Sequence, residues 1–166
     1  MTTTVKIGQN LWRSLAVACL AVGAVTFASP GFAGECPAGK MVAEGKGQQP
    51  GATAPRDVTD TLLGSIDLAG EAVMLDGRDL RLRRLVIQPG GEVPWHSHGD
   101  RPAIIYVVEG EVTEYSSTCA VPILHKAGEV SIETQGLSHW WKNTGKAPVV
   151  LISADILHDP NDAHSM

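Results

Sequence analysis

The chain has 166 residues, of which 43% are hydrophobic, and its 13 basic and 18 acidic side chains give a formal net charge of −5. An acidic surface disfavours nucleic acid and anionic membranes as partners. The length accommodates one domain with a single core and excludes a second catalytic domain.

Residues 1–33 have the features of a secretory signal peptide. Lys6 and Arg13 make a weakly basic start, residues 15–27 form an apolar run, and small residues precede a cleavage site after Ala33. The alternative, a membrane anchor, needs roughly 20 apolar residues, and this run is shorter. We therefore predict a secreted protein, periplasmic in a Gram-negative host. Its mature chain has 11 basic and 18 acidic side chains, a net charge of −7, and makes no membrane contact.

The predicted mature chain contains two cysteines, Cys36 and Cys119. Disulfides form and persist in exported proteins, so a bridge between these two residues is expected. It would tie the amino-terminal segment to the folded domain. The alternative is two unpaired thiols.

Residues 34–57 are rich in Gly, Pro, Ala and Gln without an apolar period, which predicts an extended or disordered arm. Residues 58–158 carry short β-like runs between turn signals, and residues 159–166 form a polar tail. The first of these runs, 58–63, fits either an edge strand or one helical turn. A hairpin is predicted next, because residues 72–75 and 80–82 flank an Asp-Gly turn.

Apolar alternation starts at Leu80 and breaks at Arg83-Arg84, which predicts a β-bulge or a change of face near Arg84. A tight turn at 88–91 then leads into a strand over 93–98. Further strands are expected over 104–108, 112–115, 123–125, 130–132, 137–142 and 149–156. Because no amphipathic helix follows residue 63, the pattern predicts an all-β single domain, either a sandwich or a small barrel.

Three histidines on these strands form a candidate metal site. His96 and His98 lie two residues apart, so on a strand their side chains point to the same face and can converge on one ion. Two ligands rarely hold a metal, and His139, in a second β-like stretch after a glycine, is the candidate for the third. The spacing therefore predicts a divalent metal bound by three histidines.

Both histidine segments lie in glycine frames that resemble the two motifs of the cupins, small double-stranded β-helix barrels of jelly-roll type. The first frame runs from Gly90 through His96-Ser97-His98 to Gly110, and the second from Gly128 through Gly136 and His139 to Asn143. The resemblance covers residues 80–156. It implies a single-domain cupin barrel whose interior carries the metal site.

Two positions depart from the cupin motifs. Thr134 stands where proline is usual, which leaves the turn possible. Ala103 stands where the family has a glutamate ligand, so the matched positions supply three neutral imidazoles and no carboxylate. Asp100, in the loop after His98, is the alternative source of a carboxylate, whereas Glu109 is expected to be exposed.

Three-histidine sites of this family resemble those of thiol dioxygenases and diketone-cleaving enzymes. The resemblance implies iron(II) first, with zinc, nickel, copper and manganese also suited to imidazole. It implies a metal-dependent dioxygenase or oxidoreductase acting on a small molecule inside the barrel. The alternative is a non-catalytic periplasmic cupin that binds a metal or small ligand, and the missing glutamate favours this alternative.

Two side chains near the histidines are candidates for catalytic roles. Arg101 follows the histidine pair and either holds a substrate carboxylate or pairs with an acidic neighbour. Tyr106 lies on a strand that can face inward, where it either donates a hydrogen bond or proton to a substrate or packs in the core. Of the adjacent Trp140 and Trp141, one is expected to line the pocket and the other to lie outside.

The remaining basic side chains and histidines are expected in solvent. They are Arg81, Arg83, Arg84, His125, His158 and His164, although the break in alternation allows one arginine to reach the lumen. Cupins commonly pair, and the edge strands of a jelly roll need covering, so the resemblance also implies a homodimer.

Overall fold

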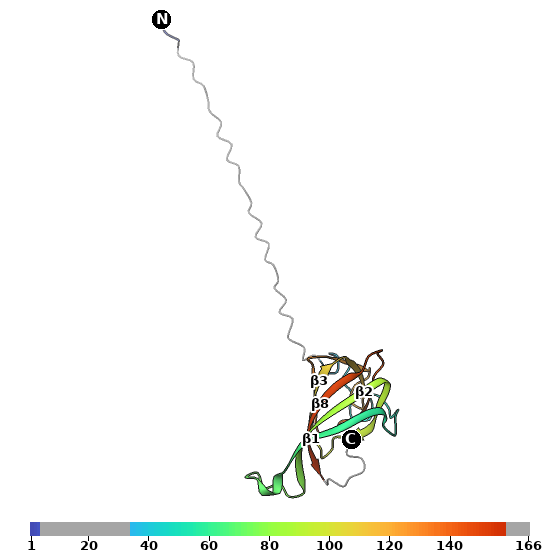
Figure 1. Ribbon diagram of the computed structural model, residues 1–166. Coiled ribbons are helices and arrows are strands. Elements are labelled where there is room, and N and C mark those ends of the chain that lie inside the picture. The colour runs from blue at the N-terminus through green and yellow to red at the C-terminus, as the bar shows by residue number, and fades with distance from the viewer. Residues whose placement is uncertain (4–33, 159–166) are drawn as a thin grey trace.

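The computed structural model describes residues 1–3 and 34–158, and nearly all of its regular secondary structure is β-strand, arranged as one nearly closed barrel (Figure 1). The all-β jelly-roll prediction is therefore confirmed. Among these residues no helix is long and apolar enough to cross a bilayer. The elements in chain order are β1 (Arg56–Asp67), the 3-10 helix η1 (Leu68–Gly70), β2 (Arg78–Ser97), β3 (Ala103–Glu109), β4 (Glu111–Ser116), β5 (Ile123–Lys126), β6 (Val130–Glu133), β7 (Ser138–Lys142) and β8 (Val149–His158).

The long strand β2 joins the two halves of the barrel. The strand order is β5-β4-β7-β2-β8-β3-β6, with β1 also paired to β2. The first part of β2, up to Ile87, pairs with β8, and the part from Glu92 onward pairs with β7. Between them the chain bends at Gly90, whose φ of +78° lies in the region that glycine tolerates best. The predicted turn at 88–91 is thus a bend within one continuous strand.

The predicted hairpin between residues 72–75 and 80–82 is wrong. The antiparallel partner of β2 is β1, where Ile66 lies opposite Leu80, and residues 68–77 connect the two strands. The ends of β1 and β2 project beyond the barrel with this connection (Figure 1). The Asp-Gly signal marks a real turn, because Gly77 has φ +65°, but this turn belongs to a longer loop.

The predicted change of face near Arg84 is also wrong. Along β2 the side chains of Arg81, Arg83, Leu85 and Ile87 are all buried, whereas Leu82 and Arg84 are exposed, so the alternation continues unbroken. The apparent break arose because two arginines occupy inward positions. The irregularity in this region is a register shift on the β1 side, between Leu62 and Gly64.

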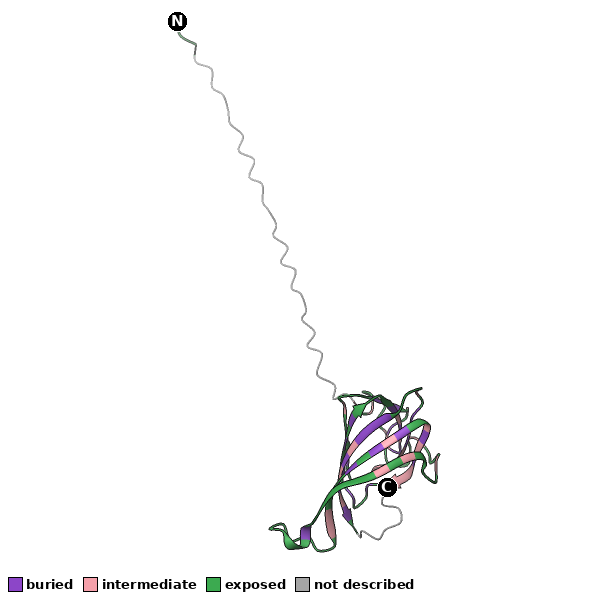
Figure 2. Cartoon of the chain, viewed as in Figure 1, coloured by how far each residue is buried: buried purple, intermediate pink, exposed green. Residues whose placement is uncertain are grey.

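An apolar core fills the barrel behind the histidines. It consists of Leu85, Ile87, Val93, Ile105, Val107, Val112, Trp141, Val149 and Leu151. Burying a side chain of this size stabilises the fold by about 1.5–3 kcal/mol each before the entropy cost of ordering it. Figure 2 shows buried and exposed residues alternating along the barrel strands, as expected for strands with one face inward.

Residues 34–55 form an extended arm that is fixed to the barrel. The predicted disulfide is confirmed: Cys36 and Cys119 are bridged, and Met41 pairs with Cys119 in an isolated β-bridge. The arm also donates a backbone hydrogen bond from Gly47 to Ser117, and Trp95 N donates to Ala52 O. The predicted leader, beyond residues 1–3, and the predicted polar tail lie outside the described residues.

Candidate metal centre

Strand pairing brings the three predicted histidines together. His96 lies near the end of β2, His98 directly follows that strand, and His139 lies on β7 opposite His96 in the antiparallel register. His98 and His139 are fully buried, and His96 is half-buried. The turn before β7 depends on Gly136, whose φ is +88°.

The three imidazoles point the same nitrogen toward one another. His139 Nε2 lies 3.0 Å from His98 Nε2 and 3.2 Å from His96 Nε2. The ring centroids are 4.7 to 4.9 Å apart, and the rings meet edge to face. This geometry leaves one point that all three Nε2 atoms face.

Hydrogen bonds at the other ring nitrogen define the tautomers. His96 Nδ1 lies 2.8 Å from Pro94 O, and His98 Nδ1 lies 2.8 Å from Arg101 O. A carbonyl oxygen can only accept a hydrogen bond, so each Nδ1 carries the proton. In the neutral ring, Nε2 then has a free lone pair. His139 Nδ1 likewise donates to Glu114 Oε1 at 2.7 Å. Three lone pairs at this separation repel unless a cation lies between them.

A fourth group, Glu133, completes the cluster and was missed by the sequence analysis. Its Oε2 lies 3.0 Å from His98 Nε2, and its Oε1 lies 3.5 Å from His139 Nε2. The candidate ligand atoms of His96, His98, Glu133 and His139 all lie within 4.8 Å of one another. Glu133 Oε1 is buried without a hydrogen-bond partner among the described residues, which fits a ligand position.

The position of Glu133 explains how Ala103 can lack the usual carboxylate. Glu133, at the end of β6, is the direct antiparallel partner of Ala103 on β3. The carboxylate therefore enters from the neighbouring strand at the same level of the barrel. A signal was present in the sequence, because the alternation of β6 places Glu133 on the same face as the buried Ser131.

Asp100 does not supply the carboxylate. Its side chain is 63% exposed and lies 3.0 Å from His158 Nδ1, at the outer surface. The candidate donor cluster therefore contains one carboxylate, that of Glu133, beside the three predicted imidazoles. His158 is exposed as predicted, and His164 lies outside the described residues.

The pKa values of the cluster residues indicate that a positive charge at its centre would stabilise it. Burial, together with His139, lowers the pKa of His98 to about 3, so this imidazole is neutral at pH 7. Burial raises the pKa of Glu133 to about 7. Burial also lowers the pKa of His139, but the adjacent Glu133 and Glu114 carboxylates outweigh it and the net pKa is raised. Either a proton or a metal ion can provide that charge, and the convergent donors fit a metal.

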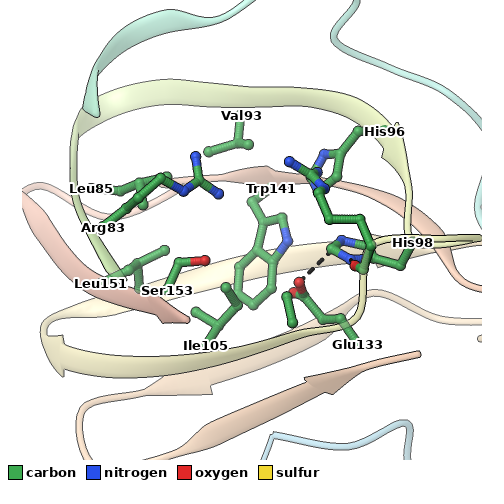
Figure 3. A pocket seen from close by; sticks show the side chains of 12 residues that line it. Arg83, Leu85, Val93, His96, His98, Ile105, Glu133, Trp141, Leu151 and Ser153 are labelled. Atoms are coloured by element: carbon green, nitrogen blue, oxygen red, sulfur yellow. Dashed lines mark hydrogen bonds and ion pairs between the residues drawn. The ribbon is translucent and has the colours of Figure 1, made fainter. Parts of the chain in front are cut away.

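A small cavity of about 30 Å³ adjoins the cluster. Its wall includes Arg83, Arg101 and Ser153 beside apolar side chains such as Trp141 and Leu151. Figure 3 shows Trp141 between the Arg83 side and the histidine side of this cavity, and the dashed line joins His98 to Glu133. A site of this kind combines metal donors, two cationic groups and an apolar wall.

The buried arginines share one carboxylate. Asp155 Oδ2 lies 2.6 Å from Arg81 Nη2, 3.5 Å from Arg83 Nη2 and 3.7 Å from Arg101 Nη1. Arg83 also pairs with Asp60 on β1. Arg81 and Arg83 therefore face the interior, contrary to prediction, whereas Arg84 is exposed as predicted. The prediction failed because, in the sequence alone, an arginine on the inward face of a strand cannot be told from a solvent-exposed one.

A buried carboxylate also binds His139 on the side of the ring opposite Nε2. Glu114 on β4 accepts from His139 at Oε1, and its Oε2 lies 2.8 Å from His125 Nε2 on β5. His125 is 0% exposed, so its predicted solvent position is wrong. The hydrogen bond to Glu114 is the physical reason that this polar ring tolerates burial.

Tyr106 does not face the lumen. Its side chain is 44% exposed, because it shares the outward face of β3 with Ile104, while Ala103 and Ile105 point inward. The inward position on which its predicted catalytic role was based is therefore wrong. The tryptophan prediction holds, because Trp141 is buried at the cavity and Trp140 stacks on Tyr115, 4.1 Å between ring centroids.

Comparison with known proteins agrees with this geometry. Residues 83–155 match the cupin domain family. Residues 83–155 therefore form a cupin domain. The match covers the part of the chain that contributes all four candidate ligands.

Plant proteins are among the similar curated proteins. Germin-like protein subfamily 2 member 2 of Arabidopsis thaliana is 36% identical over 83 residues, 48% of this chain and 38% of that protein. Nectarin-1 of Nicotiana langsdorffii x Nicotiana sanderae is 31% identical over 102 residues, 58% of this chain and 44% of that protein. The matches thus span less than half the length of these relatives.

Solved structures also align with the barrel. One is an oxalate oxidase in complex with the substrate analogue glycolate, with a TM-score of 0.48 and 22% identity over 63% of this chain and 56% of that one.

Proposed function

We propose that this cupin binds one divalent metal ion through His96, His98, Glu133 and His139 and uses it to oxidise a small anionic molecule with dioxygen. The observation that carries the proposal is the convergence of three imidazole Nε2 atoms beside the buried carboxylate of Glu133, whose Oε1 lacks a hydrogen-bond partner among the described residues. A proton can satisfy one pair of these donors, whereas a metal ion satisfies all four.

The types of donor atom limit which metal ions the site would prefer. Imidazole suits several first-row metals, and the hard carboxylate of Glu133 adds preference for iron(II) and manganese(II) over copper. When bound, such an ion supplies Lewis acidity and one-electron chemistry with dioxygen. Three protein nitrogens and one oxygen would hold the ion, which could then also accept an exogenous ligand.

The chain's own residues favour a small anion as the substrate. Arg83 and Arg101 give the cavity a cationic wall, although Asp155 offsets part of their charge. A guanidinium fork can hold a carboxylate with two hydrogen bonds. The cavity of about 30 Å³ has room for one or two waters, which restricts the substrate to a few heavy atoms. Trp141, Leu85 and Leu151 keep bulk water from the cavity wall.

A non-catalytic binding cupin is the alternative. Its main support was the missing glutamate, and Glu133 removes that argument by restoring a carboxylate to the cluster. Turnover separates the two functions, because a binder retains the metal and its ligand without consuming dioxygen.

Metal content tests the site. Wild-type protein loaded with iron(II) or manganese(II) and desalted should retain about one equivalent by elemental analysis. Glu133→Gln and His139→Ala should each lose most of it, while His158→Ala, which changes an exposed histidine, should retain it. Equal metal content in wild type and both ligand variants would rule out the site.

Dioxygen uptake tests the reaction. The loaded protein should consume dioxygen with at least one two- or three-carbon carboxylic acid, and Glu133→Gln should not. Stoichiometric metal without uptake across that panel would assign the protein to the binding alternative.

We also propose that the protein is exported. The Cys36–Cys119 disulfide supports export, because such bridges persist in oxidising compartments. Protein recovered from the native extracytoplasmic fraction should begin at Gly34 by intact mass. Recovery only in the cytoplasm with residues 1–33 attached would contradict the proposal.

A further inference from the structure

Three buried polar side chains form a row that leads away from the metal cluster. The row runs from His139 on β7 through Glu114 on β4 to His125 on β5, and these strands are neighbours in the sheet. Each carboxylate oxygen of Glu114 has its own histidine partner, at 2.7 Å and 2.8 Å. Glu114 is 2% exposed and both histidines are 0% exposed.

Fold stability does not require such a row. Replacing a buried ionic cluster by well-packed apolar residues is often neutral or stabilising, because desolvation offsets the Coulombic attraction. The inner end of the row is the ring of His139, whose Nε2 faces the other candidate ligand atoms of the cluster. A role at the metal accounts for both facts.

The outer end of the row lies under the amino-terminal arm. His125 Nδ1 is buried and lacks a hydrogen-bond partner among the described residues. The backbone of Gly34 lies directly against it, since a Cβ at Gly34 would be 2.9 Å from this nitrogen. A second cavity, lined by Gly34, Cys36 and Glu114, begins here. The disulfide-linked arm therefore covers the far end of the row.

We propose that Glu114 and His125 are positioning residues that set the orientation and donor strength of His139 at the metal. Glu114 Oε1 accepts a hydrogen bond from His139 Nδ1–H, which leaves the Nε2 lone pair to coordinate the metal and increases its electron density. His125 donates to the second carboxylate oxygen and thereby fixes the plane of the carboxylate. This inference rests on the metal site of the proposed function.

Changes at Glu114 and His125 should therefore alter the bound metal although neither residue is a ligand. Loss of an outer partner of a metal-bound histidine typically lowers affinity by about 10–100-fold. Glu114→Gln keeps the shape but removes the charge and should fall in this range. His125→Ala should act in the same direction with a smaller effect, because Glu114 still holds His139.

The experiment measures cobalt(II) affinity by competition with a chromophoric chelator and records the visible spectrum of the bound ion. Ser116→Ala is the matched control, because Ser116 is buried on β4 and its side chain bonds to Thr118. Lower affinity and shifted bands in Glu114→Gln and His125→Ala, but not in Ser116→Ala, would support the proposal. If Glu114→Gln fails to fold, His125→Ala decides alone.

Two other results would overturn the inference in distinguishable ways. Wild-type affinity and an unchanged spectrum in both variants would remove the positioning role while leaving the metal site intact. A wild-type protein that binds no cobalt(II), iron(II) or manganese(II) would overturn the proposed function and this inference together.

Discussion

At the residue scale, the strongest constraint on the interior is the charge around Asp155. This single carboxylate, 2% exposed, faces three buried guanidinium groups, those of Arg81, Arg83 and Arg101. Buried ions are stable only while they remain paired. The wall of the metal cavity therefore depends on a residue that does not line it.

Asp155→Asn should accordingly destabilise the fold strongly. Removing one partner of a buried ion pair costs about 3–5 kcal/mol, because the remaining charge stays desolvated. Urea denaturation of the metal-free protein measures the loss. Asp76→Asn, at an exposed position in the β1–β2 connection, should change the unfolding free energy by less than about 0.5 kcal/mol. Equal stabilities of the two variants would contradict the assignment.

Glu114 should make the metal-free protein sensitive to acid. Burial raises its pKa, but the charges and hydrogen bonds of His139 and His125 outweigh burial and bring it to about 2. A lowered pKa means that the stabilisation is present above the unfolded value near 4.3 and is lost as pH falls toward 2. The loss is on the order of 3 kcal/mol.

Unfolding free energies of wild type and Glu114→Gln between pH 6 and pH 2.5, in the presence of a chelator, provide the measurement. The difference between them should shrink as the pH falls. A constant difference across this range would show that Glu114 is not ionised in the folded protein.

The sequence predicted three of the four cluster residues. His96, His98 and His139 followed from strand parity and motif spacing. Glu133 could not be predicted in this way, because the motif expects the carboxylate at position 103. Coordination requires only that the carboxylate lie close to the histidines, from whichever strand. Arg83 and His125 were misplaced because their burial depends on partners, Asp155 and Glu114, from distant strands.

At the element scale, the β3–β6 ladder sets where the carboxylate enters. Ala103 and Glu133 are register partners, so either strand could deliver a glutamate to the cluster. Moving the carboxylate back to β3 therefore tests this reading of the site.

Glu133→Ala should lose metal affinity, and Ala103→Glu in the same chain should recover most of it, to within about tenfold of wild type. Chelator competition measures both. Ile104→Glu combined with Glu133→Ala is the matched control, because Ile104 is 54% exposed and points outward. Recovery by Ile104→Glu, or none by Ala103→Glu, would contradict the ladder geometry.

Most strands after residue 100 could be predicted from alternation and glycine turns, because each is short and has one apolar face. The β1–β2 pair could not. Its connection is long, so the local Asp-Gly turn pointed to the wrong partner, and its register depends on β2 pairing with β8 at the same time.

At the scale of the whole molecule, the outer face of the barrel is unusually apolar. Leu82, Ala154, Ile104 and Ile132 are register partners across β2, β8, β3 and β6. Leu82, Ile104 and Ile132 are 42%, 54% and 57% exposed. A contiguous apolar row on adjacent strands is typical of an interaction surface. Because the same row on a second copy is complementary to it, we infer that the expected homodimer forms through this face rather than through the barrel edges.

If this inference is right, Leu82→Glu combined with Ile104→Glu should give a monomer, since four carboxylates would face one another in the inferred dimer. Light scattering after size exclusion gives the mass. Leu124→Glu, at a 45% exposed position on β5 in the other half of the barrel, should leave the dimer intact. A wild-type monomer at micromolar concentration would disprove the association.

The placement of Glu133 also has a kinetic consequence. The three histidines lie on or directly after β2 and β7, in the middle of the strand order, whereas Glu133 lies on β6, at its end. Terminal strands open more often than central ones. In the proposed metal site the carboxylate would therefore detach first, and the residence time of a bound ion should follow the frequency with which β6 separates from β3.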